Sequence, residues 1–166
     1  MTIIEAFKSV RDMPYRIPLV LGEKDVCCSG KHKILKDLFV EQGLTVRYRV
    51  CSFLWSSLDL PSDISNVPHD DLSSHVWLEV LIDDNWIIVD ATWDISVRNI
   101  LHVNEWDGKS NTETAVKPLD IFTPQKSADI MNGENDDDIL SDLKINGEFY
   151  KAFNNWLAEN RVSVSE

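Results

Sequence analysis

The chain has 166 residues, of which 28 are acidic and 16 are basic, so its formal net charge is −12. With 43% hydrophobic residues this length suits one sizeable core, and we expect a single domain over residues 1–166. The negative charge disfavours nucleic acid and anionic lipid as partners, because both are polyanions. It fits a well-solvated surface, and it would also attract a basic substrate.

Neither the apolar pattern nor the cysteines indicate export. No apolar run approaches the roughly eighteen residues of a membrane span, and the first twenty residues carry five charged side chains where a secretion signal needs an apolar segment. The three cysteines, Cys27, Cys28 and Cys51, are too few and odd in number for a disulfide framework. We therefore expect free thiols, no membrane association and a cytoplasmic location.

The first predicted element is a short helix over residues 3–12. Thr2 followed by Glu5 is a capping-box pattern, and apolar residues recur at helical spacing until Pro14. Residues 14–24 contain two prolines and a glycine, which predicts an irregular arm. This arm leads directly to the pair of adjacent cysteines.

A second helix is predicted from an N-cap at Asp25 to Gly43, which suits the left-handed position beyond a helix end. Its apolar face consists of Ile34, Leu35, Leu38 and Phe39. Residues 44–50 alternate apolar and polar side chains and predict a half-buried strand. Residues 51–74, with two prolines and several serines and aspartates, predict a long loop of the kind that often borders a site.

Residues 75–82 and 86–92 predict an antiparallel hairpin at the centre of the sheet. A four-residue loop between them places Trp77 opposite Asp90, with His75 as the diagonal neighbour on the same face. A three-residue loop would put His75 and Asp90 on opposite faces. Since a buried carboxylate is costly without a partner, this register predicts that His75 satisfies Asp90.

The C-terminal part is harder to interpret from the sequence. Residues 94–134 predict irregular structure with one strand near 115–122. The acidic run at 135–142 can open a helix, because carboxylates favour the positive end of a helix dipole. After Gly147 the apolar spacing predicts a final core-facing helix that ends near Arg161.

Cys28 is the first candidate for chemistry. With Asp25 as N-cap it is the third residue of its helix, inside the turn whose free N–H groups and dipole stabilise an anion. Such a position beside a histidine lowers the pKa of a thiol, and the thiolate is the nucleophilic form. A cysteine is also a small hydrophobe suited to a core, so this position alone does not decide its role.

Three separated stretches together resemble a known family. A cysteine at a helix start, fifteen residues before Gly43, is followed by HVWLEV and then by WIIVDATWD. This order and spacing over residues 25–94 is similar to the transglutaminase-like superfamily, relatives of papain-like cysteine hydrolases. The resemblance implies an α+β fold with a papain/transglutaminase-like core: a cysteine-bearing helix packed on an antiparallel sheet, and a C-terminal helix. It also implies a triad of Cys28, His75 and Asp90.

The chemistry implied by the resemblance is thiol hydrolysis without a cofactor or metal. His75 would take the proton of Cys28, Asp90 would orient His75, and the thiolate would attack an amide of a peptide or protein substrate to give an acyl-enzyme. An amine acceptor would instead make the chain a transamidating transglutaminase. One oxyanion donor would be the Cys28 N–H. Papain-like enzymes often take the second from a glutamine a few residues before the cysteine, but both glutamines of this chain follow Cys28. Tyr15, which precedes the cysteine, is therefore the candidate for the second donor.

Two other interpretations stay open on the sequence. Cys28 and His32 are four residues apart on one helical face, and His69 or His75 could complete a metal site, although no Cys-x-x-Cys pattern supports it. A non-catalytic domain of the same fold that binds a peptide or protein partner would carry the same residues. The large or charged residues around the proposed triad are interpreted as structural: Trp77, Glu79, Trp86 and Trp93.

Overall fold

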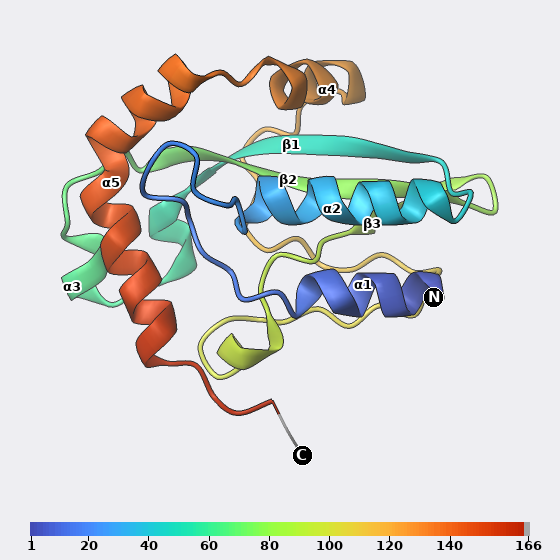
Figure 1. Ribbon diagram of the computed structural model, residues 1–166, viewed down its shortest axis with the longest axis horizontal. Coiled ribbons are helices and arrows are strands. Elements are labelled where there is room, and N and C mark those ends of the chain that lie inside the picture. The colour runs from blue at the N-terminus through green and yellow to red at the C-terminus, as the bar shows by residue number, and fades with distance from the viewer. Residues whose placement is uncertain (165–166) are drawn as a thin grey trace.

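The computed structural model describes residues 1–164 and has a mixed α+β architecture (Figure 1). Strands β1, β2 and β3 form an antiparallel sheet with β2 in the centre. The strands are β1 (Val46–Leu54), β2 (Leu72–Ile82) and β3 (Asn85–Val89). The α-helices are α1 (Ile3–Arg11), α2 (Cys28–Glu41), α3 (Ser62–Ser65), α4 (Pro124–Gly133) and α5 (Asp136–Glu159). No helix in this part of the chain is both long and apolar enough to cross a membrane.

Helix α1 begins as its sequence predicts. The Glu5 backbone N–H donates to the Thr2 hydroxyl at 3.1 Å, and the Thr2 N–H donates to the Glu5 carboxylate at 2.8 Å. This reciprocal pair satisfies two donors that a helix start otherwise leaves free. The capping box is therefore confirmed.

Helix α2 starts later than predicted, because its N-cap is Cys27 and not Asp25. The Asp25 carboxylate instead accepts the Cys27 N–H at 2.9 Å and the Ser29 hydroxyl at 2.7 Å. The preceding residue Val26 is paired with Arg16 of the arm, and this pairing keeps the chain outside the helix until Cys27. Cys28 is consequently the first residue of the helix and not the third.

Two glycines shape the ends of α2. A Cβ on Gly30 would lie 2.0 Å from the Asp25 carbonyl oxygen, so only glycine lets the preceding segment fold back over the first turn. Gly43 has a φ of +83°, the left-handed conformation predicted for it beyond the helix end. The fold of α2 thus depends on glycine at both of its ends.

The hairpin has the predicted register. Leu81 lies opposite Trp86, and a two-residue turn of Asp83 and Asp84, both with positive φ, closes the pair of Ile82 and Asn85. Positive φ at both central residues is typical of the tight turn that matches strand twist. The predicted loop at 51–74 is wrong in its extent, because β1 continues to Leu54, β2 starts at Leu72, and two short helices lie between them.

Two hydrophobic clusters cover the two faces of the sheet. One joins α1 and α2 to the even-numbered side chains of β2, including Phe7, Leu35, Phe39, Leu78 and Val80. The other joins the odd-numbered side chains to the arm and to α5, including Tyr15, Phe53, Trp77, Trp93 and Phe153. In Figure 1, α1 and α2 lie side by side over the sheet, and α5 stands at one end of it beside α3.

The C-terminal part differs most from its prediction. No strand forms near 115–122 in the described chain; instead Leu119, Asp120 and Phe122 make isolated backbone hydrogen bonds to β1. Helix α4 was not predicted, although Thr123 caps it through its side chain. The acidic run does open a helix with Asn135 as N-cap, but α5 then continues through Gly147 as one element, because its apolar face packs along its C-terminal half.

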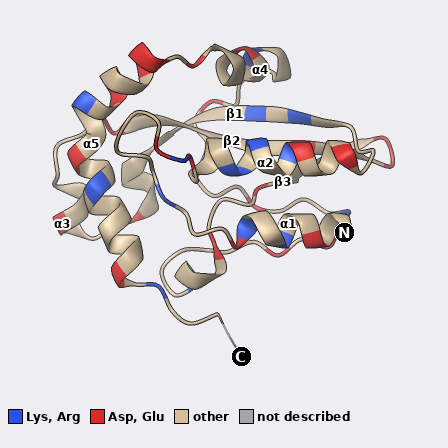
Figure 2. Cartoon of the chain, in the orientation of Figure 1, with Lys and Arg blue, Asp and Glu red and all other residues tan. Residues whose placement is uncertain are grey.

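The excess negative charge is not gathered on one element. Figure 2 shows acidic residues on α2, on α5 and at the turn between β2 and β3, with lysines and arginines elsewhere on α2 and α5. On the sheet itself Glu79 pairs with Arg47 at 2.7 Å and with Arg49 at 2.9 Å. This distribution agrees with a solvated surface.

Candidate active site

The hairpin brings His75 and Asp90 into direct contact. His75 Nε2 and Asp90 Oδ2 are 2.8 Å apart, and both side chains are buried. Leu78 pairs with Val89, so Asp90 follows opposite Trp77 with His75 diagonally adjacent on the same face. The predicted contact is confirmed. Since an ionised carboxylate only accepts hydrogen bonds, the tautomer that fits carries its proton on Nε2.

Asp90 is held by more partners than the sequence predicted. Its Oδ1 accepts the backbone N–H and the hydroxyl of Thr92, and its Oδ2 accepts the Ala115 N–H at 2.8 Å beside His75. Burial by itself raises the pKa of Asp90, but the charge and hydrogen bond of His75 and the bonds from Thr92 outweigh it, so this pKa lies well below its ordinary value. Asp90 is therefore an ionised, fully satisfied acceptor.

The backbone of Asp90 is anchored by the irregular segment that follows. Its N–H donates to the Thr112 hydroxyl at 2.9 Å, and its carbonyl accepts the Asn104 side-chain amide at 2.9 Å. Asn104 also donates to the Glu113 carbonyl at 2.8 Å. The segment predicted only as irregular thus fixes the position of the aspartate.

Cys28 lies half-buried at the first position of α2. Its neighbour Cys27 has a pKa well above the ordinary value, first because the Cys28 side chain lies beside it, then because it is buried and close to Asp25. The Cys27 thiol contacts the Ser29 hydroxyl at 3.3 Å. Within residues 1–164 no hydrogen bond joins the Cys28 thiol to His75, so the site brings the histidine and aspartate together without the sulfur.

His32 connects the helix start to the aspartate. Its Nδ1 lies 2.7 Å from the Cys28 carbonyl oxygen, and its Nε2 accepts the Ala91 N–H at 3.0 Å and is 3.8 Å from Asp90 Oδ1. Burial lowers the pKa of His32 to about 4, against the opposing effect of Asp90, so the ring is neutral. Both ring nitrogens are engaged, which disfavours the metal site considered for Cys28 and His32.

A pH-dependent loss of stability is expected from His32. The unfolded chain protonates it near pH 6.5 and the folded chain only near 4, so the unfolded state binds more protons between these values and stability falls as the pH falls. The full effect is about 3 kcal/mol. The free energy of unfolding, measured by chemical unfolding at pH 4 to 7, should depend less steeply on pH in His32→Gln than in the wild type. The exposed control His102→Gln should keep the wild-type slope, and a slope unchanged in His32→Gln would contradict a neutral His32.

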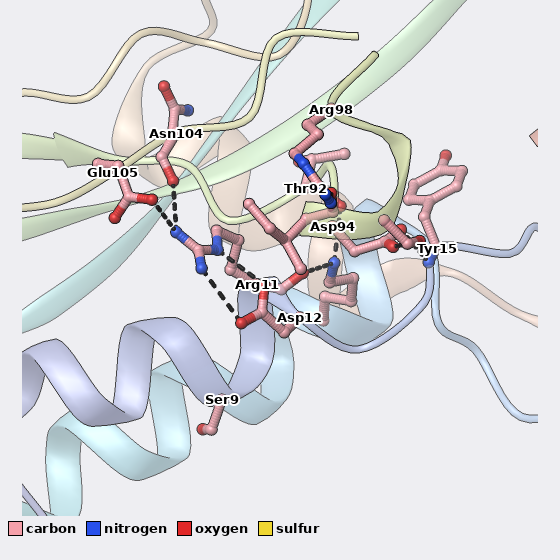
Figure 3. A network of polar contacts seen from close by, with 12 residues as sticks. Ser9, Arg11, Asp12, Tyr15, Thr92, Asp94, Arg98, Asn104 and Glu105 are labelled. Carbon is pink, nitrogen blue, oxygen red and sulfur yellow. Dashed lines mark hydrogen bonds and ion pairs between the residues drawn. The ribbon is translucent and has the colours of Figure 1, made fainter. Parts of the chain in front are cut away.

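Tyr15, the candidate oxyanion donor, is held by its backbone. Its N–H donates to the Asp94 carboxylate at 2.9 Å and its carbonyl accepts from Arg161 at 2.7 Å, and Figure 3 shows it beside Asp94 at the edge of a polar network. Burial raises the pKa of Tyr15 well above its ordinary value, and the nearby Cys27 and Cys28 add to the shift. The hydroxyl therefore keeps its proton close to the two cysteines.

Cys51 is a thiol beside the histidine, a neighbour that the sequence analysis did not predict. It pairs directly with His75 across β1 and β2 and is completely buried. Burial and then the charge of Asp90 raise its pKa to about 12. A thiol that stays protonated in the core is unsuited to attack a substrate, so Cys51 is a packing residue.

The tryptophans and Glu79 have structural contacts, as predicted. Trp77 and Trp93 belong to one core cluster, and the Trp93 indole N–H donates to the Ala115 carbonyl at 3.2 Å. The Arg47 guanidinium lies 3.8 Å above the Trp86 ring. Trp77 and Trp93 thus belong to the core on the face of His75, whereas Trp86 lies opposite Leu81 near the turn of the hairpin.

Comparison with known proteins found no matching family model, no similar curated protein and no similar solved structure. Within residues 1–164 no three His, Cys, Asp or Glu side chains are grouped so that they could hold a metal ion. The function is therefore argued from the site itself.

Proposed function

We propose that this chain is a thiol hydrolase of the peptidase or amidase type with a papain/transglutaminase-like core, in which Cys28, His75 and Asp90 form the catalytic triad. The observation that carries the proposal is the buried contact of 2.8 Å between His75 and Asp90, next to a helix whose first residue is Cys28. A nucleophile, a base and a group that orients the base are the three parts that covalent catalysis by a thiol requires.

The chemistry follows from the tautomer of His75. With the Nε2 proton held by Asp90, Nδ1 carries the lone pair that can accept the proton of the Cys28 thiol. The thiolate attacks the substrate carbonyl, the imidazolium protonates the departing amine, and an acyl-enzyme remains. Water then releases the acid; an amine in the place of water would make the same intermediate transamidating.

Two donors are available for the negative charge on the carbonyl oxygen. The Cys28 backbone N–H lies at the start of α2, where N–H groups have no partner inside the helix. The Tyr15 hydroxyl is protonated and near the cysteines, and it serves as the second donor in this proposal. The neighbouring Cys28 side chain, burial and Asp25 raise the pKa of Cys27, which disfavours Cys27 as the nucleophile.

The proposed substrate is a peptide or protein amide, and the proposed location is the reducing cytoplasm. Three cysteines without a disulfide fit such a compartment. The negative net charge of −12 continues to disfavour nucleic acid.

A non-catalytic binding domain is the second candidate. It is favoured by one observation, the lack of a hydrogen bond between Cys28 and His75 among the described residues. Catalytic hydrogen bonds are often long before substrate binds, so this observation alone does not exclude turnover. The reactivity of the thiol separates the two candidates.

The test is the rate of alkylation by iodoacetamide between pH 5.5 and 9, resolved by tandem mass spectrometry of the peptide that contains both adjacent cysteines. Cys28 of the folded protein is expected to react at pH 6.5 at least about tenfold faster than Cys28 of the urea-unfolded chain, because only an activated thiol is ionised there. Equal rates in the two states would leave the binding domain as the better interpretation.

A further inference from the structure

Lys31 is a buried amine in the helix that carries Cys28. Its side chain is fully buried, three residues after the cysteine, yet its Nζ makes two hydrogen bonds to main-chain carbonyls. The Arg11 carbonyl accepts at 2.9 Å and the Thr92 carbonyl at 2.7 Å. One amine therefore joins the end of α1 and the segment after β3 to α2.

Burying this amine is costly, which sets it apart from ordinary packing. Burial lowers the pKa of Lys31 to about 7, although nearby carboxylates oppose the shift. The Arg11 carbonyl is at the negative end of α1, where a cation is favoured. The charged or titratable groups that face Lys31 from the packed elements are Asp12, His32, Asp90, Asp94 and Arg161.

The Thr92 carbonyl is the important contact for the site. The N–H and the hydroxyl of the same residue, Thr92, hold Oδ1 of Asp90, while Oδ2 of Asp90 holds His75. A continuous series of hydrogen bonds thus runs from Lys31 through Thr92 and Asp90 to His75. Figure 3 shows Thr92 and Arg11 in the same polar network as Asp94 and Asn104.

We propose that Lys31 is a positioning residue: it holds the Asp90–Thr92 turn against the helix that carries Cys28 and thereby sets the orientation of His75. The proposal rests on the proposed thiol chemistry for its functional meaning. A methionine would fill similar space without donors, so it would leave the buried carbonyls of Arg11 and Thr92 unpaired. A structural role alone would lower only the stability of the fold, whereas a positioning role would also change the bond of His75 to Asp90 and the reactivity of Cys28.

The test compares Lys31→Met with Lys33→Met, an exposed lysine on the same helix. Two quantities are measured: the rate of Cys28 alkylation at pH 6.5, and the proton NMR resonance of the His75 Nε2–H, which reports its bond to Asp90. Lys31→Met is expected to lower the rate about tenfold and to shift or broaden the resonance through exchange. In Lys33→Met the rate of Cys28 alkylation should stay within twofold of the wild-type rate, and the His75 resonance should be unchanged.

Two outcomes would overturn the role of Lys31. One is a folded Lys31→Met with wild-type resonance and rate. The other is failure of both Lys31→Met and Lys31→Gln to fold. The amide of glutamine still donates two N–H bonds, so failure of this variant as well would show that Lys31 supports the whole fold and not the position of His75. If wild-type Cys28 shows no enhanced alkylation, the proposed function fails, while the His75 resonance in the variants still decides whether Lys31 positions the histidine.

Discussion

Cys28→Ser is expected to abolish labelling by an electrophilic thiol probe at pH 6.5, with a loss of more than about 100-fold, while Cys27→Ser keeps the wild-type rate within about threefold. Both thiols are half-buried, so access alone does not separate them. They differ in environment: Cys28 is the first residue of α2, whereas the pKa of Cys27 is raised well above its ordinary value by the neighbouring Cys28, by burial and by Asp25. A sulfur that keeps its proton is a poor nucleophile.

Intact-mass spectrometry of the probe adduct measures this prediction, and Cys51→Ser is the matched control. Cys51 is buried with a pKa raised to about 12, so its replacement should not change the labelling rate at this pH. Loss of labelling in Cys27→Ser together with its retention in Cys28→Ser would move the nucleophile to Cys27. That result would also contradict the assignment of Cys28 to the triad, which rests on its place as the first residue of α2.

Asp90→Asn is expected to slow alkylation of Cys28 at pH 6.5 by at least about 100-fold, because it changes which nitrogen of His75 carries the proton. Every partner of the Asp90 carboxylate is a donor: Thr92 with its N–H and hydroxyl, Ala115 with its N–H, and His75. An asparagine offers one oxygen acceptor and directs an NH₂ group at the remaining donors. Where the NH₂ group faces His75, the ring must accept at Nε2, which moves the ring proton to Nδ1 and leaves no base for the thiol; in either orientation the negative charge that stabilises the imidazolium is lost.

The same substitution is expected to lower the free energy of unfolding by about 3 kcal/mol, since buried donors lose their acceptor. Alkylation kinetics and urea unfolding at neutral pH measure the two effects separately. Asp84→Asn is the matched control, because this exposed turn residue has a positive φ that asparagine also adopts, and neither quantity should change. Wild-type alkylation in a folded Asp90→Asn would show that His75 does not depend on the aspartate.

The local features of this chain could be predicted from its sequence. The capping box of α1 depends on residues three apart, and the register of the hairpin depends on a turn and a strict alternation, so both were predicted correctly. The contact between His75 and Asp90 followed from that register, since side chains on one face of paired strands must be neighbours.

The errors arose where distant segments compete with local preference. Asp25 is a good N-cap residue, but the adjacent Val26 pairs with Arg16 and therefore stays extended. The helix begins two residues later than predicted, and its N-cap is Cys27. Gly147 has a low helix propensity, yet α5 runs through it because its apolar side chains pack on the core on the C-terminal side. Packing partners of this kind lie far apart in the sequence and leave no local pattern.

By itself the sequence determined the helix that carries Cys28, the central hairpin and the meeting of a histidine with an aspartate, because each depends on a short repeat of side chains. Only the tertiary structure decided the surroundings of that pair. His32 is neutral and Lys31 is buried because α1, α2 and the segment after β3 enclose them, and Ala115 reaches Asp90 from across the irregular region. Burial and hydrogen bonding between distant segments set the charge of a group, and those are properties of the packed chain.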